Sequence, residues 1–155
     1  MKNLILIIAA AFAATAHAQI ISDDKVPAAV SSAFKAKFPE AEKAKWEMEN
    51  AKDYEVTFII NKGEQAAVFD ANGNWLETEI EIKVSELPQA VSQAIAKQFS
   101  AYKIKEAERV EKKEGSISFE VELAKGKEIL EVVFSRAGGV LEKKTAGKKD
   151  KEDKD

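Results

Sequence analysis

Three glutamates that alternate along one short segment are the residues best spaced for chemistry. Glu77, Glu79 and Glu81 follow Trp75 in the segment NWLETEIEI, residues 74–82. In an extended strand this alternation places the three carboxylates on one face, about 7 Å apart. Paired carboxylates can perform general acid–base catalysis, but nothing in the sequence marks a pocket around these three. A solvated sheet face is therefore the preferred interpretation, and a hydrolase that uses carboxylates alone is the least favoured.

Trp75 is the most informative single residue, because the alternation predicts that it shares the face of the three glutamates. A large aromatic side chain on a polar face can anchor a protein partner. It can also pack against Tyr54 or Trp46, or cover a sheet edge. Trp46, in phase with Met48, is expected to lie mainly in the core. The candidate partner-contacting residues are Trp75, Glu77, Glu79, Trp46 and Tyr54.

The first eighteen residues, MKNLILIIAAAFAATAHA, are typical of a cleaved signal peptide. The apolar run after Lys2 is too short to span a bilayer, so we expect no stable membrane insertion. The predicted mature protein begins at Gln19 and is periplasmic or secreted. The chain has no Cys, and its single His, His17, lies in this segment. We therefore expect no thiol or imidazole catalysis, no catalytic residue, no zinc site and no cofactor.

The charges give no sign of a nucleic-acid partner or of a metal site. The chain has 24 Lys and Arg against 27 Asp and Glu, a net charge of −3, which is no footprint for nucleic acid. The segment DANGN, residues 70–74, resembles a calcium loop, but its Gly stands fourth instead of sixth, and strands are expected on both sides. The terminal segment TAGKKDKEDKD, residues 145–155, has the dense mixed charge expected of a disordered tail.

The chain repeats itself. The stretches VFDANGNWLETE, residues 68–79, and VFSRAGGVLEKK, residues 133–144, share Val-Phe, a turn with Gly, and Leu-Glu at the same spacing. Upstream, residues 24–41 align with residues 85–102, so that Val26-Pro27 matches Leu87-Pro88. We predict a tandem repeat of a unit of about 60 residues, with copies at residues 19–83 and 84–144.

Each copy is predicted to be a helix followed by four short antiparallel strands. Asp24 and Ser85 are candidate N-caps, and one apolar stripe follows each of them. The period then switches to two, as in residues 54–60 and 118–123, and turn signals separate the strands at residues 61–63, 71–73, 125–126 and 138–139. The predicted class is α+β. In each copy the helix covers one face of a four-stranded antiparallel sheet and the other face stays polar, with the two copies docked side by side.

The chain resembles the PepSY-like family of small exported bacterial proteins, also described as beta-lactamase-inhibitor-like. The resemblance is carried by Val26-Pro27 and Leu87-Pro88, by FPEA at residues 38–41 with Trp46, and by FDANGNWLETE at residues 69–79. It implies a tandem helix-plus-sheet fold. The inhibitor name implies a concave sheet face that clamps an enzyme, but none of the inhibitor's enzyme-contacting residues maps onto this chain. The inhibitor also has disulfides, which this chain lacks.

Two functional hypotheses follow. The preferred one is a non-enzymatic exported protein that binds or modulates another envelope protein through its exposed sheet face. The alternative is a small apolar ligand-binding or envelope-stress protein that holds its ligand between helix and sheet. The two hypotheses differ in whether the helix–sheet space is filled and in whether the polar face is hollowed.

Overall fold

A single nine-stranded antiparallel sheet forms the body of the protein. The computed structural model describes residues 19–146, so the predicted signal peptide lies outside the described residues. The strands lie in chain order from β1 to β9. The sequence predicted two four-stranded sheets docked side by side. Instead, β5 pairs with β6, and the sheet is continuous.

Apart from β1, which has no counterpart in the second half, the elements follow one another in the same order in both halves of the chain. The first half contains β1 (Gln19–Ile21), the 3-10 helix η1 (Asp23–Lys25), α1 (Ala28–Lys37), β2 (Glu42–Met48), β3 (Asp53–Ile60), β4 (Gly63–Asp70) and β5 (Trp75–Glu81). The second half contains η2 (Val84–Glu86), α2 (Gln89–Gln98), β6 (Lys103–Lys112), β7 (Ile117–Lys125), β8 (Glu128–Ser135) and β9 (Val140–Ala146). Strand β9 includes two residues assigned to the tail from sequence, and residues 147–155 lie outside the description.

The two α-helices begin later than the sequence predicted. Asp24 and Ser85 lie inside the 3-10 helices η1 and η2 and cap neither α-helix. The N-cap positions of α1 and α2 are held by Pro27 and Pro88, whose backbone is extended. Proline favours this conformation and has no N–H to satisfy, so each helix starts directly after it.

Two apolar clusters fix the helices to one face of the sheet. In the first, Val30 and Phe34 of α1 pack on β2, β3 and β4. In the second, Val91 and Ile95 of α2 pack on β6, β7 and β8. The predicted inward phases of β3 and β7 are confirmed, because every second side chain of each strand enters its cluster: Val56 and Phe58 in β3, and Phe119, Val121 and Leu123 in β7.

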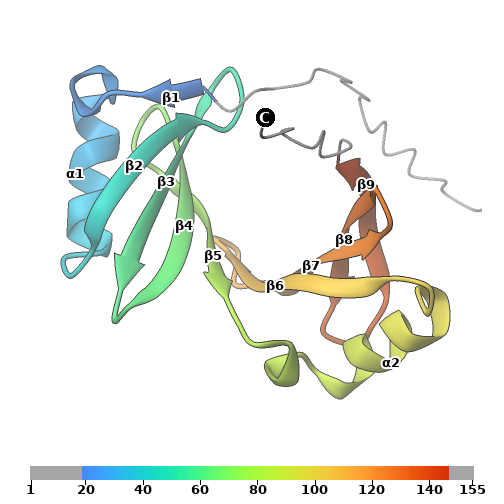
Figure 1. Ribbon diagram of the computed structural model, residues 1–155. Coiled ribbons are helices and arrows are strands. Elements are labelled where there is room, and N and C mark those ends of the chain that lie inside the picture. The colour runs from blue at the N-terminus through green and yellow to red at the C-terminus, as the bar shows by residue number, and fades with distance from the viewer. Residues whose placement is uncertain (1–18, 147–155) are drawn as a thin grey trace, which may run out of the picture.

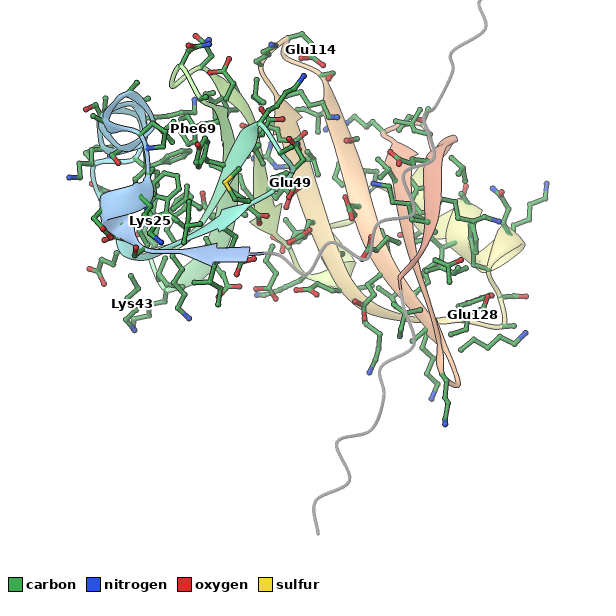
Figure 2. The ribbon with its side chains drawn as sticks, turned by 90° about the horizontal axis from the view of Figure 1, so that it is seen from above. Lys25, Lys43, Glu49, Phe69, Glu114 and Glu128 are labelled. Carbon is green, nitrogen blue, oxygen red and sulfur yellow. The ribbon has the colours of Figure 1, made fainter. Side chains whose placement is uncertain are left out.

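The sheet is strongly curved, and the helices lie on the outside of the curve. In Figure 1 the strands from β2 to β4 and those from β7 to β9 rise on opposite sides of an open centre. Helices α1 and α2 lie on the outer sides of these strands, away from the centre. Figure 2, viewed from above, shows Phe69 beside α1 and Glu49 on the inner side of the strands. The inner face is the polar one, as predicted, and strands from both halves contribute to it.

Candidate functional site

Glutamates from six of the nine strands converge on the inner face of the sheet. In β3, β6, β7 and β8, strand alternation directs them inward, because their neighbours along the strand enter the apolar clusters on the outside. The glutamates of β5 and β9 lie on the same face because they pair in register with residues of that face, as Glu79 does with Val110 and Glu142 with Val133. We call the following set the acidic face: Glu55, Glu77, Glu79, Glu81, Glu106, Glu108, Glu120, Glu122, Glu131 and Glu142.

Six glutamates of the acidic face line a hollow of about 470 Å³, which we call the central hollow. Its lining runs from β3 across to β9, so residues far apart in the sequence meet there. Val110 and Val133 form an apolar part of the lining, and Ser118 lies beside them. Glutamates make up most of the remainder, so the lining is mainly acidic with a small apolar part.

Carboxylates stand directly opposite one another on neighbouring strands of this face. Glu108 of β6 pairs in register with Glu81 of β5 and with Glu120 of β7. Glu122 of β7 likewise pairs with Glu106 and with Glu131. Like charges in directly opposite positions destabilise a sheet. The arrangement therefore costs stability, and such costs concentrate at functional sites.

Burial and mutual repulsion make several of these carboxyls hold their protons near neutral pH. Burial, then the negative charges of Glu108 and Glu120, raises the pKa of Glu79 to about 8. Burial, then Glu120 and Glu106, raises the pKa of Glu108 to about 7. Burial, then the neighbouring Glu49, raises the pKa of Glu55 to about 7. These groups can bind cations or exchange protons at physiological pH.

Two lysines partly balance the charge. Lys112 Nζ lies 3.4 Å from Glu77 Oε2, and Lys144 Nζ lies 3.1 Å from Glu142 Oε1. Both lysines line the central hollow. Within residues 19–146, no ion pair involves Glu79, Glu108 or Glu120.

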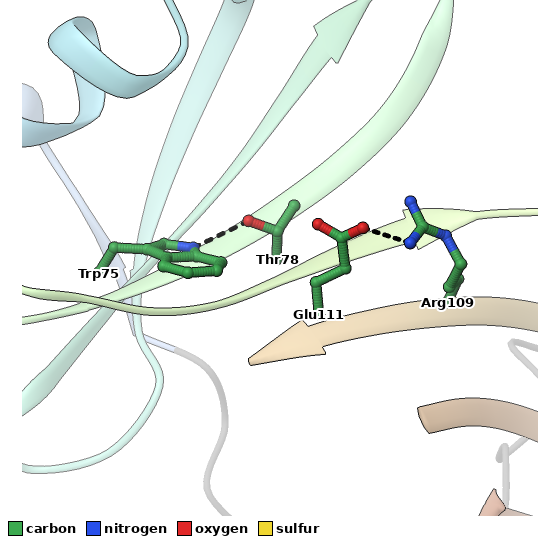
Figure 3. A network of polar contacts seen from close by, with 4 residues as sticks. All are labelled: Trp75, Thr78, Arg109 and Glu111. Atoms are coloured by element: carbon green, nitrogen blue, oxygen red, sulfur yellow. Dashed lines mark hydrogen bonds and ion pairs between the residues drawn. The ribbon is translucent and has the colours of Figure 1, made fainter. Parts of the chain in front are cut away.

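Trp75 does not lie on the acidic face, and the prediction that it shares a face with Glu77 is wrong. Phe69 pairs with Trp75 while the adjacent Val68 pairs with Glu77, so Leu76 is an extra residue in a β-bulge. One extra residue reverses the alternation, and Trp75 therefore packs into the apolar cluster beneath α1. Its indole Nε1 donates a hydrogen bond of 2.8 Å to Thr78 Oγ1, as Figure 3 shows beside the Arg109–Glu111 pair.

The other aromatic candidates also lie on the helix side. Trp46 is 4% exposed and packs edge-on against Phe34, with ring centroids 5.4 Å apart. Tyr54 is half-buried against the same cluster. Of the five residues selected from the sequence, the structure brings only Glu77 and Glu79 together on the inner face, where both line the central hollow.

The sequence analysis missed most of the acidic face, although each strand carried a signal for it. The segments SFEVEL and KEAERVEK place glutamates two residues apart, with an apolar residue between them. That pattern predicts glutamates on one face of each strand. Their convergence depends on sheet curvature and on the β5–β6 pairing, which no local pattern specifies.

The helix-backed antiparallel sheet places this chain in the beta-lactamase-inhibitor-like class of folds. Residues 13–59 and 52–142 match the family described as "Putative beta-lactamase-inhibitor-like, PepSY-like". The chain therefore belongs to the PepSY-like family, as its sequence motifs indicated.

Several solved structures share the fold. A BLIP-like protein from Bacteroides fragilis is 29% identical, with a TM-score of 0.64, and the match covers 83% of this chain and 92% of that one. A structure from Bacteroides eggerthii, described as "putative periplasmic proteins", is 22% identical with a TM-score of 0.70, covering 77% and 88%. A DUF2874 family protein from Bacteroides uniformis is 21% identical with a TM-score of 0.69, also covering 77% and 88%.

No curated protein matches the chain. Among the residues that the structure describes, no helix has the length and apolar character needed to cross a membrane.

Proposed function

We propose that this protein is an exported, non-enzymatic binding module that receives another envelope protein on its acidic face. The observation that carries the proposal is the central hollow, which is lined from β3 to β9 and lies open on the face opposite both helices. The apolar clusters cover the outer face and stabilise the fold. The inner face, where glutamates oppose one another, is therefore available for recognition. A periplasmic or secreted location is supported by the signal-like residues 1–18 and by the relative described as periplasmic.

We also infer that the two halves are copies of one duplicated unit, with the boundaries given above. Two matched details support this inference. Leu76 of β5 and Leu141 of β9 are each the extra residue of a bulge. On the partner strand, the first bulge lies opposite the step from Val68 to Phe69, and the second lies opposite the step from Val133 to Phe134. The turns before these bulges also approach their helices in the same way, because Gly73 lies against Ala29 of α1 and Gly138 lies against Ala90 of α2. Duplication of one helix-and-strand unit would explain why both halves of the chain contribute strands to the same curved sheet face.

Binding of an apolar ligand between helix and sheet is less well supported, because aromatic rings occupy that space under α1. Phe34 lies 5.2 Å from Phe58 between ring centroids, and Phe38 lies 4.6 Å from Phe58.

Acid–base chemistry by the carboxyls of raised pKa also fits the acidic face. Binding accounts better for the breadth of that face, because acid–base catalysis needs only two such groups.

The test is capture of partners from an envelope fraction by the immobilised protein. Val133→Trp fills the central hollow without changing its charge and should reduce capture at least about tenfold, a loss of about 1.4 kcal/mol of binding free energy. Val84→Trp is the matched control, because Val84 is 45% exposed and lies in η2, outside the lining of the hollow. Equal capture by both variants would contradict the proposal.

A further inference from the structure

The acidic face has a charge balance that calls for a cationic occupant. Its glutamates oppose one another across four neighbouring strands, in the rows Glu81–Glu108–Glu120 and Glu106–Glu122–Glu131. The only cations that line the central hollow among the described residues are Lys112 and Lys144, and each is paired with its own glutamate. A ligand that brings positive charge to the unpaired carboxylates would relieve the repulsion that the fold leaves in place.

A buried hydroxyl gives a second, independent indication of a ligand. Ser118 is only 7% exposed, lines the central hollow and shares its strand face with Glu120. Within residues 19–146 its hydroxyl makes no side-chain hydrogen bond. Among the described residues no fully enclosed side-chain polar atom lacks a partner, so this hydroxyl keeps some contact with solvent. Hydroxyls at such positions normally have a partner.

The lining next to Ser118 suits a long side chain with an apolar stem. Val110 lies opposite Ser118 in register and is itself paired with Glu79 on its other side. Val133 is paired with Glu120. Val110 therefore lies between Glu79 and Ser118, and Val133 lies in the neighbouring row, between Glu120 and Glu142. Lysine and arginine bury their methylene stems on apolar surface and keep their charged ends beside polar groups.

We propose that the partner presents a lysine- or arginine-rich segment to the acidic face. One of its cationic side chains enters the central hollow, packs its stem on Val110, and is held by Glu79, Glu120 and the hydroxyl of Ser118. This inference rests on the proposed function and specifies the chemistry of the partner. A protein segment fits better than a metal ion, because the described residues include no group of acidic side chains placed to hold one. The rows of opposed glutamates can receive several cations along such a segment.

The direct test uses fluorescence anisotropy with a labelled peptide of alternating lysine and glycine. The protein from Gln19 to Asp155, without the predicted signal peptide, should bind this peptide and should not bind its glutamate–glycine counterpart. Glu79→Gln with Glu120→Gln should weaken binding about tenfold or more at low salt, and Ser118→Ala should weaken it about threefold, as expected for one lost hydrogen bond. Added salt should weaken binding by the wild type more than by the double variant.

Glu40→Gln with Glu114→Gln is the matched control, because it makes the same two Glu→Gln changes at exposed glutamates outside the acidic face. This pair should change affinity less than about twofold, since exposed charges at a distance are screened. An equal loss in both pairs would show that net charge alone attracts the peptide, and would overturn the proposal. Full competition by spermidine at the peptide's own affinity would also overturn it, in favour of a small polyamine.

The capture experiment separates this inference from the proposed function. If Val133→Trp abolishes capture while the Glu79→Gln/Glu120→Gln variant captures as well as the wild type, the binding face stands and the cationic partner is wrong. If Val133→Trp leaves capture intact, the binding face itself is wrong. Loss of capture by both variants, with capture retained by Glu40→Gln/Glu114→Gln, supports both.

Discussion

At the residue scale, two glycines hold the hairpin turns against the helices. Gly73 has φ +83° and Gly138 has φ +82°. A Cβ built on Gly73 would lie 2.6 Å from the carbonyl oxygen of Ala29 in α1, and one on Gly138 would lie 2.4 Å from that of Ala90 in α2. Any side chain would have to displace helix backbone as well as adopt a left-handed conformation. The two turns thereby fix the distance between each helix and its sheet.

Gly138→Ala should destabilise the protein by about 2–4 kcal/mol, because conformational strain and a backbone clash act together. Gly126→Ala is the matched control, since Gly126 also has a positive φ, of 61°, but has open space around its Cβ position. It should cost only about 1 kcal/mol. Urea unfolding measures both values. Equal losses in the two variants would mean that the approach to Ala90 is not a tight constraint.

Trp75 is expected to stabilise the fold and not to contact a partner. Trp75→Phe retains an apolar ring but removes the hydrogen bond to Thr78, which is only 4% exposed. The orphaned hydroxyl should cost about 1–3 kcal/mol of unfolding free energy, and adding Thr78→Val should recover much of that loss. Partner capture should be unchanged throughout. Reduced capture by a folded Trp75→Phe variant would restore the anchor role predicted from sequence.

At the element scale, the sequence predicted regular strands well and irregular ones poorly. The alternation in β3 and β7 assigned Val56, Phe58, Phe119 and Val121 correctly to the core, because each of these strands keeps strict alternation. In β5 the same rule failed at Leu76. A bulge arises from pairing with another strand and from docking on a helix, so the alternation within one segment does not reveal it. The short edge strand β1 also left no clear periodic signal.

The two bulges differ in what covers them, and this difference predicts unequal effects of mutation. Leu76 is half-buried, because β6 lies beside β5 in the sheet. Its carbonyl oxygen accepts a hydrogen bond of 2.8 Å from Lys113 N–H. Leu141 lies in the last strand, β9, and is 64% exposed. Leu76→Ser should therefore cost about 1–2 kcal/mol, and Leu141→Ser less than about 0.5 kcal/mol. Thermal unfolding of the two variants checks this order, and the reverse order would contradict the burial argument.

At the scale of the whole molecule, the continuous sheet explains both the success and the limit of the sequence analysis. The order of helices and strands could be predicted because amphipathic periods and glycine turns are local signals. The union of the halves through β5 and β6 could not, since it depends on a pairing between strands separated by α2. That pairing places Glu79 and Glu81 beside Glu108, and it joins the glutamates of the two halves into one acidic face.

The acidic face should make the whole protein less stable as pH rises from about 5 to about 8. The pKa of Glu79 is raised to about 8, and the pKa values of Glu55 and Glu108 to about 7, chiefly by burial. In the unfolded chain these carboxyls lose their protons near pH 4.5. Between those values the native state binds more protons than the unfolded state, so unfolding becomes easier with increasing pH.

Thermal unfolding across this pH range measures the effect. The melting temperature should fall by at least about 3 °C, a modest value because the carboxyls are only partly buried and solvent screens their repulsion. Below pH 4.5 the effect should disappear, because both states then hold the protons. Glu79→Gln with Glu108→Gln should raise stability at pH 8 and flatten the pH dependence, while Glu40→Gln with Glu114→Gln should keep the wild-type slope. A melting temperature that rises between pH 5 and pH 8 would contradict the destabilising role of the opposed glutamates, and with it the physical reason for expecting a cationic partner.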